Sequence, residues 1–392
     1  MKKTLLALAV GAAFAAPAAY ADVTISGSIN MGIEYHNVDG GEVDGADSVG
    51  NFGVANNYSN LTISSLEDLG GGLKLDFALQ VQLAPGDDNA ALANRNSHIG
   101  LVSDSWGGIW YGTNEHIYER YLYQVDPLDG AAGMGGNLQI LGTPGGQVFG
   151  TYGDSESGYS FYRRDGQSLW YDSPNFGGFT FGAVWQMDFN AENDHPSGKG
   201  TQDVDRNPMM FQVGGKYASP SMPLELWAAL AYRTDQFGLD AATGVNSESS
   251  SDQGWHVGAA WTLGDIKLFG GWENIKYESD LVGGGDADWE RDAFYAGLKW
   301  NLASGYVGAQ YIQALEANCG GIADGTCDDT GGWMVGLGYY HTMSKQTQLY
   351  VVGSYLDNDD GGFYGLAGIG NDNDFVQGST AWGIGVGLKH SF

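Results

Sequence analysis

The residues that most often perform chemistry are scattered in this sequence. None of the seven histidines belongs to a His-Glu-x-x-His zinc motif, and the chain lacks a Gly-x-Ser-x-Gly nucleophile motif and a phosphate-binding loop. A Ser/His site assembled from separate strands, as in membrane lipases or proteases, is a minor alternative. We therefore expect no enzyme, no cofactor and no metal centre. The histidines are His36, His98, His116, His195, His256, His341 and His390.

The two cysteines could form a covalent link. Cys319 and Cys327 have seven residues between them, in a stretch rich in Gly, Asp, Ala and Thr. A metal site would need further Cys or His close by, and none is present. The chain carries an export signal, described below, and disulfides form in oxidising compartments. We predict a disulfide that pins this local loop.

An acidic stretch at residues 357–361, Asp-Asn-Asp-Asp-Gly, resembles half of a calcium loop. Glycine stands where a ligand is needed, and no glutamate follows at the far end of an EF-hand spacing. We interpret the stretch as a solvated outer loop. Weak bridging of divalent cations to anionic lipid head groups is the alternative.

The elements that would position these residues show most clearly in the last strand, residues 380–392. Apolar side chains alternate with glycine and polar side chains, and aromatic residues, Trp382 and Phe392, stand at both ends. A strand shows successive side chains to opposite faces. A membrane barrel strand needs ~9–11 residues with an apolar outer face and aromatic residues at both interfaces. This stretch satisfies that requirement.

The N-terminus has the pattern of a signal peptide. Two lysines, Lys2 and Lys3, precede an apolar core at residues 5–16, and Ala-Tyr-Ala follows. We predict cleavage between Ala21 and Asp22, so that residues 1–21 are a signal peptide and residues 22–392 form one mature domain. The apolar core is shorter than the ~20 residues of a membrane helix, and no other apolar run approaches that length. The chain would therefore cross a membrane as strands.

Composition excludes several classes of protein. The formal net charge of −30 at pH 7 argues against nucleic acid as a partner, because phosphate binding needs a basic surface. Charged residues make up only 16% of the chain, against roughly 25% in ordinary soluble domains. An aromatic content of 13% argues against disorder. With 64 glycines, the composition favours many strands joined by turns.

The alternation of apolar and polar residues recurs along the chain. Short and long connections alternate between the strands, as in outer-membrane barrels, and an even count lets the first and last strands pair. We predict an all-β transmembrane antiparallel barrel of about sixteen strands, with fourteen and eighteen as alternatives. Its histidines (His256, His341, His390) are expected at the membrane interface. The predicted strands cover residues 23–35, 58–65, 73–83, 95–102, 109–113, 167–172, 179–187, 209–218, 224–234, 255–262, 266–277, 291–301, 306–313, 333–342, 348–356 and 380–392.

Six stretches, in this order along the mature chain, resemble the Gram-negative general porin family. They are residues 22–28, 67–73, 95–101, 171–179, 344–350 and the closing strand. The resemblance implies a homotrimer of sixteen-stranded barrels in the outer membrane, in contact with its lipid and lipopolysaccharide. Small hydrophilic solutes and ions would diffuse through each barrel. It also implies that the terminal Phe392 is the recognition signal for the barrel-assembly machinery.

The resemblance assigns a role to residues 114–165, the longest segment without strand alternation. As the third long connection, it would fold into the lumen and narrow it. In the family this loop carries carboxylates that face basic residues on the wall, and the field between them tunes ion selectivity. The candidate carboxylates here are Glu115, Glu119, Asp126 and Asp129, followed by Asp154 and Glu156.

The basic wall is also assigned from the resemblance. Arg95 matches the arginine that opens the fourth strand, and Arg164, with Arg163 beside it, matches the one after the third loop. Parity is ambiguous for Arg95, because Ile99 and Leu101 share its phase. A lipid-facing arginine costs ~2–4 kcal/mol at the bilayer midplane, which favours the lumen. Secondary candidates are Arg120, Arg233 and Lys74.

The sequence departs from the family pattern in a way that bears on selectivity. Asn60, Ser64 and Trp170 stand where the family often has basic residues. We therefore predict a cation-preferring pore. The alternatives are a substrate-specific channel, in which Tyr118, Tyr121 and Tyr123 would bind sugars, and, less favoured, an adhesin barrel with a plugged lumen or an outer-membrane enzyme.

Overall fold

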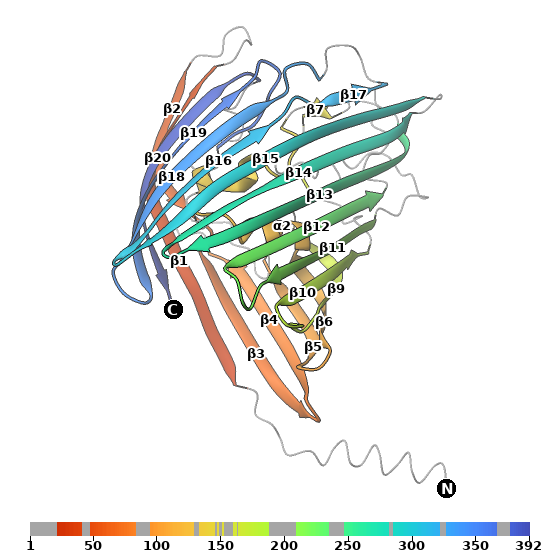
Figure 1. Ribbon diagram of the computed structural model, residues 1–392, viewed down its shortest axis with the longest axis vertical. Helices are drawn as coiled ribbons and strands as arrows, with labels where there is room; N and C mark the ends of the chain where they lie inside the picture. Colours follow the sequence, from red (N-terminus) through yellow and green to blue (C-terminus); the bar gives the residue numbers. More distant parts are fainter. Residues whose placement is uncertain are drawn as a thin grey trace.

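The computed structural model describes thirteen segments of the chain (Figure 1). They are residues 22–40, 48–83, 95–128, 133–145, 147–148, 151–152, 160–162, 164–187, 209–234, 247–281, 285–321, 327–366 and 377–392. None of the helices in these segments is both long and apolar enough to cross a membrane.

Within the described segments, 16 strands close a single antiparallel barrel, which confirms the predicted fold class. Each strand pairs with its neighbours in sequence, and the first strand pairs with the last from Ser28↔Ser391 to Asp39↔Thr380, so the ring has no open edge. The barrel strands are β1 (Val23–Asp39), β3 (Asn60–Gly70), β4 (Leu73–Gln82), β5 (Ser97–Ser103), β6 (Gly107–Glu115), β9 (Arg164–Asp172), β10 (Phe179–Gln186), β11 (Met209–Ala218), β12 (Leu224–Thr234), β13 (Ser247–Leu263), β14 (Ile266–Leu281), β15 (Asp286–Leu302), β16 (Gly305–Ala314), β18 (Gly332–Thr342), β19 (Thr347–Asn358) and β20 (Thr380–Ser391).

Two short strands extend the ring beyond these sixteen. β2 (Val49–Asn56) pairs with the upper half of β1, above the part that pairs with β3, so β2 and β3 together make one interrupted barrel strand. In the same way β17 (Asn318–Gly320) continues β16 along β15. A separate hairpin consists of β7 (Gln147–Val148) and β8 (Thr151–Tyr152).

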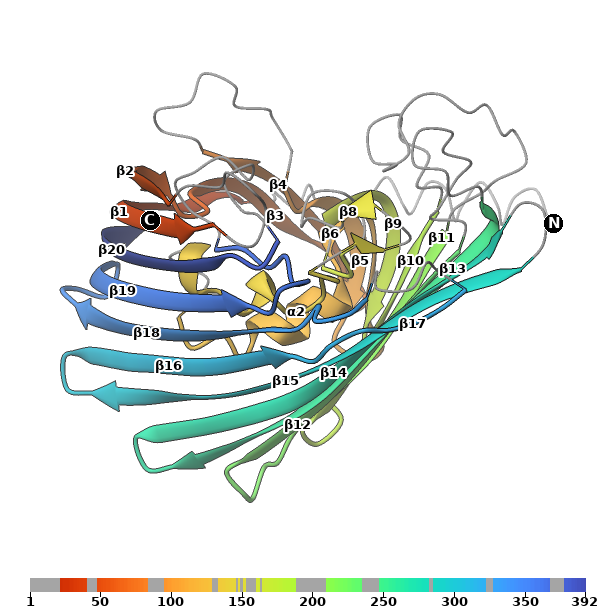
Figure 2. The ribbon, with the colours of Figure 1, turned by 90° about the horizontal axis from the view of Figure 1, so that it is seen from above.

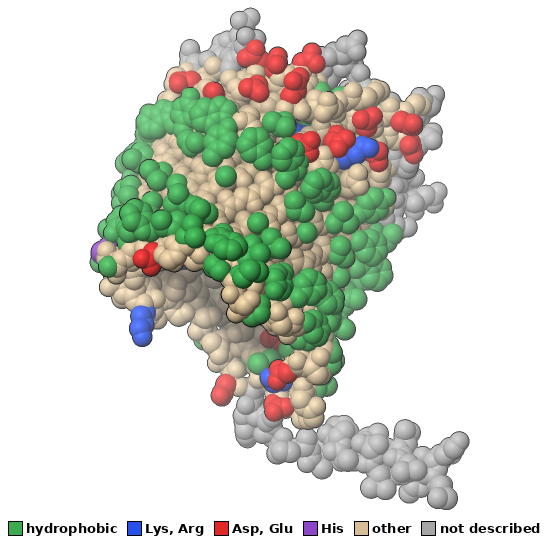
Figure 3. Space-filling view, viewed as in Figure 1, with side chains coloured by type: hydrophobic (Ala, Val, Ile, Leu, Met, Phe, Trp, Pro, Cys, Tyr) green, Lys and Arg blue, Asp and Glu red, His purple; other side chains and the backbone are tan. Residues whose placement is uncertain are grey.

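The period-two pattern sorts side chains between lipid and lumen. In β20, Trp382, Ile384 and Val386 are 40%, 50% and 51% exposed, whereas Ala381 on the other face is buried. The same outward apolar row recurs on neighbouring strands, and hydrophobic side chains cover much of the outer wall in Figure 3. Acidic side chains gather along the upper rim, beyond this belt. An apolar outer band with charged ends matches the requirement of a membrane barrel.

Several predicted strand boundaries are wrong. Residues 37–56 were expected to form a loop, yet β1 extends to Asp39 and β2 occupies the end of that range. Likewise, β13 begins at Ser247, eight residues before the predicted strand. At the ends of β1 and β13 apolar alternation stops but backbone pairing continues into the aqueous rim, where polar side chains suffice. β2 keeps the outward apolar residues Phe52 and Val54, but its glycines and asparagines resemble a turn.

The segment between β6 and β9 contains the helices. They are α2 (Ile117–Tyr123) and two 3-10 turns, η1 (Gly133–Gly135) and η2 (Asn137–Gln139). Figure 2 shows α2 inside the ring of strands. The sequence predicted the inward fold of this segment but not its helix.

Candidate pore constriction

Helix α2 lies against the inner wall because its apolar stripe meets a wall glycine. Ile117 and Tyr121 are four residues apart, so they share one face of the helix. A Cβ at Gly214 would lie 2.5 Å from Ile117 Cγ2 and 2.6 Å from Tyr121 Cε2, so the absence of a side chain there gives the helix room. Glu119 and Tyr123, also four apart, lie on the opposite face and point away from this wall contact.

The wall also satisfies the polar backbone of the helix. The side chain of His116 at the N-cap makes no capping hydrogen bond. Instead Gln212 Oε1 accepts a hydrogen bond from Tyr118 N at 2.9 Å, and His256 Nε2 donates to Tyr118 O at 3.1 Å. His256 is fully buried under the loop, so its expected position at the membrane interface is wrong.

A buried carboxylate joins the helix to the second half of the loop. Glu273 on β14 is fully buried. Its carboxylate accepts hydrogen bonds from Tyr118 OH at 2.8 Å and from Gly142 N at 2.8 and 3.0 Å. Arg291 on β15 completes the set, with Nη1 3.1 Å from Glu273 Oε1. We call these four residues the loop clasp.

Arg291 extends the clasp to the loop backbone. Its Nη2 donates to the carbonyl oxygens of Ile140, at 3.1 Å, and Thr143. Because a buried charge needs a partner and hydrogen bonds for its remaining donors, these contacts fix where residues 140–143 lie.

A second buried pair lies on the neighbouring wall. Arg233 on β12 contacts Asp252 on β13 at 3.1 Å, and neither side chain is exposed. Arg233 also donates to Ser160 O at 2.9 Å and stacks over the Phe161 ring, 4.3 Å from its centroid. Arg233 was a secondary candidate for the basic wall. Here its charge is neutralised and covered by the loop.

The last outer loop reaches down to the inward-folded loop. Tyr364 is buried, and its hydroxyl donates to Pro144 O at 3.0 Å. Phe363 N donates to Gly145 O at 2.7 Å. Asn358 holds the backbone of Tyr364 at both ends, through bonds of 2.8 and 2.9 Å. The two loops therefore support each other inside the barrel.

The free face of α2 meets a cluster of charges at the ends of the neighbouring strands β6 and β9, where Glu115 pairs with Arg164. Arg164 Nη2 lies 2.9 Å from Glu115 Oε1 and 4.0 Å from Glu119 Oε1. Asn96 Oδ1 accepts from Arg164 Nε at 2.8 Å and from Glu115 N at 3.0 Å. Burial and the nearby Arg164 guanidinium lower the pKa of Arg95, and the Glu115 and Glu119 carboxylates act in the opposite direction. These residues come from three separate parts of the chain and form one charged eyelet.

Arg95 faces the lumen although its parity matches lipid-facing residues. Its Nε donates to Gln80 Oε1 at 3.3 Å, and its guanidinium lies 5.8 Å from the centroid of the Tyr58 ring. β5 begins only at Ser97, so Arg95 precedes the regular alternation and is free of it.

The protonation of Glu119 is shifted by this environment. Burial raises the pKa of the Glu119 carboxyl to about 8, and the neighbouring Glu115 carboxylate acts in the same direction. Arg164 and a hydrogen bond from Tyr123 oppose the rise. Glu119 therefore changes its charge near neutral pH.

The remaining predicted residues are not part of the eyelet cluster. Asp126 is buried, and its Oδ1 accepts from Leu128 N at 2.9 Å. Arg120 pairs with Asp172 at 2.7 Å and Lys74 with Asp104 at 3.5 Å, so each basic side chain already has an acidic partner. Asp129, Asp154, Glu156, Arg163 and Ala21 lie outside the described residues.

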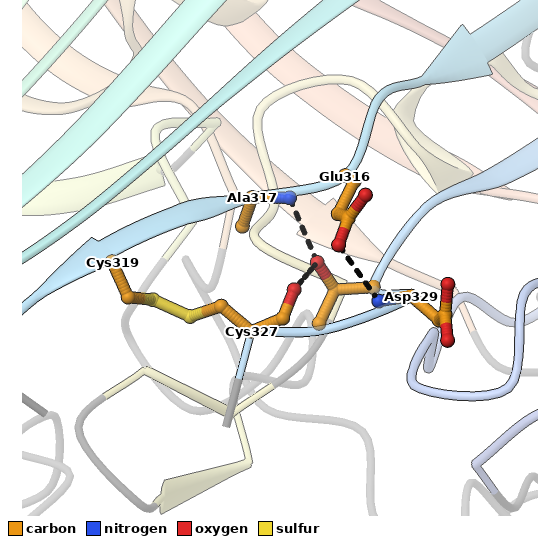
Figure 4. Close-up of a disulfide and its surroundings, with 6 residues drawn as sticks. Glu316, Ala317, Cys319, Cys327 and Asp329 are labelled. Carbon is orange, nitrogen blue, oxygen red and sulfur yellow. Dashed lines mark hydrogen bonds between the residues drawn. A yellow bond between two sulfur atoms is a disulfide. The ribbon is translucent and has the colours of Figure 1, made fainter. Parts of the chain in front are cut away.

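Cys319 and Cys327 form a disulfide at the rim, with Cα atoms 6.1 Å apart (Figure 4). Thr330 Oγ1 donates to Cys327 O at 3.0 Å and accepts from Ala317 N at 2.8 Å. The disulfide closes a local loop beside β17. Within the described segments, no group of three or more His, Cys, Asp or Glu could hold a metal ion.

Sequence reasoning missed the loop clasp. Glu273 and Arg291 each lie on the inward parity of their strands, together with the buried Ile275 and Trp289. The parity of these charged residues could have identified them as lumen-facing. Their hydrogen bonds to residues 140–143 could not have been predicted, because no local pattern indicates a contact across about 150 residues.

The fold and this eyelet define a class of protein. A closed barrel with an apolar outer belt, whose lumen is narrowed by an inward-folded loop carrying charged side chains, is a porin-type membrane channel.

Comparison with known proteins gives the family. The sequence profile described as Gram-negative porin matches residues 6–361, so the chain belongs to the Gram-negative porin family. It is 30% identical over 396 residues to outer membrane porin protein 32 of Delftia acidovorans, and the alignment covers all of both chains. The chain is therefore an outer-membrane general porin, and the family consists of non-enzymatic channels.

Solved structures support the same fold. An anion-selective porin from Comamonas acidovorans superposes with a TM-score of 0.69 at 23% identity, covering 95% of this chain and 100% of that one. The trimer form of OmpT from Vibrio cholerae gives a TM-score of 0.58 at 12% identity, covering 95% and 99%.

Proposed function

We propose that this porin prefers cations and that its selectivity is set at the eyelet. Glu115 at the end of β6 and the loop residues Glu119 and Asp126 supply the acidic charges, and Arg95 and Arg164 supply the basic charges beside them. Above the Glu119 pKa of about 8, when all three acids are ionised, the three acidic charges exceed the two basic ones. An excess of one sign in a narrow pore raises the local concentration of the opposite ion.

The pairing of two further arginines on the inner wall supports the proposed cation preference. Arg233 and Arg291 are fully buried in pairs with Asp252 and Glu273, so they add no free positive charge to the lumen. Trp170, at a position where the family often has arginine, is buried and stacks on Trp110 with ring centroids 6.0 Å apart. The thinning of the basic wall is the observation that carries the proposal.

The anion selectivity of the Comamonas acidovorans porin argues in the other direction. At 23% identity that structure supports the fold alone, and selectivity depends on individual charges. The two proteins therefore make a useful contrast in one assay.

The test is the reversal potential of the reconstituted channel in a potassium chloride gradient, at a pH above the Glu119 pKa of about 8. We expect potassium to be favoured. Glu115→Gln should shift the potassium-to-chloride permeability ratio toward chloride, because Arg164 loses the carboxylate 2.9 Å away. Asp104→Asn is the matched control, because it removes the same charge from an exposed turn. The Asp104 side chain is 89% exposed. A wild-type channel that favours chloride would refute the proposal.

The sugar-binding alternative loses two of its three tyrosines. Tyr118 and Tyr121 are buried against the wall, so their ring faces do not meet a passing solute. Tyr123 alone remains on the free face of α2, which does not make a stacking track. We therefore favour unspecific diffusion of small hydrophilic solutes and ions.

We also propose the maturation and assembly steps that the family implies. Cleavage after Ala21 would leave Asp22, which is exposed just before β1. Phe392 exchanges two backbone hydrogen bonds of 3.0 Å with Gly27, and its ring is exposed for recognition by the barrel-assembly machinery. Three copies would form a trimer in contact with outer-membrane lipid and lipopolysaccharide. The intact mass of the outer-membrane form and its sedimentation in detergent test cleavage and trimerisation; a retained leader or a monomer would refute them.

A further inference from the structure

A backbone irregularity interrupts the barrel wall beside the eyelet. β1 pairs with β2 up to Met31↔Asn56 and with β3 from Ser28↔Asn60. Two residues of β1 therefore face three residues, 57–59, which is a bulge. At its centre Tyr58 has a φ of +61°, a conformation that residues other than glycine rarely adopt.

Polar side chains on both sides hold this bulge in place. Asn57 Nδ2 donates to Glu34 Oε1 at 2.8 Å and lies 3.0 Å from Tyr350 OH. Ser59 Oγ accepts from Asn30 N at 2.9 Å and donates to Asn30 O at 3.2 Å. All five of these residues are buried. A strained residue persists only where its surroundings over-determine it, and such residues cluster at functional sites.

The bulge changes the direction in which Tyr58 points. Phe52 and Val54 share its parity and are 74% and 63% exposed on the lipid face. Tyr58 lies instead beside Arg95, whose guanidinium bonds the lumen-facing Gln80. The bulge reverses the parity between β2 and β3, so Tyr58 shares the lumen-facing phase of Asn60 and Thr62, which contact Gln80.

Tyr58 faces the inward-folded loop across the eyelet. Burial raises the pKa of the Tyr58 hydroxyl, and the Glu119 and Asp126 carboxylates raise it further. Burial likewise raises the pKa of Tyr123 on α2, and Glu119 and the Tyr58 hydroxyl add to that rise. The Tyr58 side chain is 42% exposed, although its neighbours Asn57 and Ser59 are buried. The exposed surface is therefore open to the water-filled lumen.

We propose that Tyr58 is a specificity-determining residue that sets the size limit of the pore from the wall side. The bulge directs the Tyr58 ring toward Glu119 and Tyr123. The Arg95 guanidinium stacks on the ring and is thereby held beside the eyelet. The solutes affected are hydrated ions and small organic cations that fill the eyelet. The inference rests on the proposed constriction but not on its cation preference.

The first test is a size series. Bi-ionic reversal potentials give the permeability of tetramethyl-, tetraethyl- and tetrabutylammonium relative to potassium. Tyr58→Gly removes the ring and accepts the positive φ. We expect conductance to rise about 1.5-fold and the permeability of the larger ions to rise more than that of the smallest. A folded Tyr58→Gly channel with an unchanged size series would overturn the proposal. Tyr58→Asn, which also tolerates this φ, repeats the test if the glycine variant fails to fold.

The second test asks which side of the wall Tyr58 occupies. Both native cysteines are in the disulfide, so a new cysteine is the only free thiol. In Tyr58→Cys, a water-soluble methanethiosulfonate reagent should reduce the current in steps. In the control Phe52→Cys, on the lipid face, it should not. Block in neither variant would place Tyr58 outside the lumen and refute the proposal. The potassium-to-chloride ratio of wild type is read separately, so failure of the cation preference would remain distinguishable.

Discussion

Removing one partner of the loop clasp should loosen the constriction without opening the barrel. Arg291 and Glu273 are fully buried and 3.1 Å apart. Arg291→Met would leave the Glu273 carboxylate buried without its cation and would remove the hydrogen bonds to Ile140 O and Thr143 O. Breaking a buried pair in this way costs about 3–5 kcal/mol.

That cost falls on the docking of the loop, because the strands keep their own hydrogen bonds. A free energy of about 1.4 kcal/mol corresponds to a tenfold change in an equilibrium constant, so the ratio of docked to undocked loop should fall roughly 100-fold to 4,000-fold. Single-channel recording should show this as larger open-channel noise and spontaneous closures. Hydrogen exchange should rise at residues 133–145, while the heat-modifiable mobility of the barrel stays unchanged.

Two further variants decide whether the reasoning is right. Arg291→Met combined with Glu273→Gln removes the unpaired charge but keeps an acceptor for Gly142 N and Tyr118 OH, so its channel should be quieter than the single variant. Lys276→Met breaks an ion pair at the solvent-exposed rim and should change nothing, because such pairs contribute little. An Arg291→Met channel as quiet as wild type, or a double variant as noisy as the single one, would refute the clasp.

Three other perturbations have predictable directions. Glu119 holds its proton below a pH of about 8 and carries a negative charge above it, so the preference for potassium should increase as pH rises through that value. Glu119→Gln should abolish this pH-dependent increase. An increase of equal size in the variant would exclude Glu119 as its cause. Gly145→Ala would place a Cβ 1.9 Å from the Tyr364 ring and should displace the outer loop. Hydrogen exchange at residues 359–366 should become faster, as it should in Tyr364→Ala. Exchange as slow as in wild type would contradict the contact. Gly214→Val should push α2 into the lumen and lower the conductance, whereas an unchanged conductance would mean that the helix does not narrow the pore.

The barrel could be predicted because its pattern is local. Alternation over a few residues assigns each strand and its two faces, and turn residues mark the ends. β11 and β12 begin and end at the predicted residues because Ser219 and Pro220 mark a tight turn between them. The eyelet residues Glu115, Glu119 and Arg164 came from resemblance to the family, and the structure places them together.

The interior could not be predicted in this way because its contacts are distant in sequence. Helix α2 has only two turns and no capping side chain of its own, so its sequence carries little helical signal. It is stabilised by Gln212, His256 and Glu273, which lie about 90–155 residues away. Tyr58 was assigned to a strand, and only the hydrogen bonds of its neighbours reveal the bulge.

We expect the large negative charge of the chain to contribute little to ion selectivity. Screening reduces the interaction of exposed charges separated by more than a Debye length, about 8 Å at physiological ionic strength. The rim carboxylates, such as Asp357, Asp359 and Asp360, lie outside the barrel interior, where salt screens them from an ion at the eyelet. The buried pairs of Arg233 and Arg291 are neutral units that position the loop. Under the proposed function we therefore expect the few partly exposed charges around Arg164 to decide which ions pass, so neutralising one of them should outweigh neutralising several at the rim.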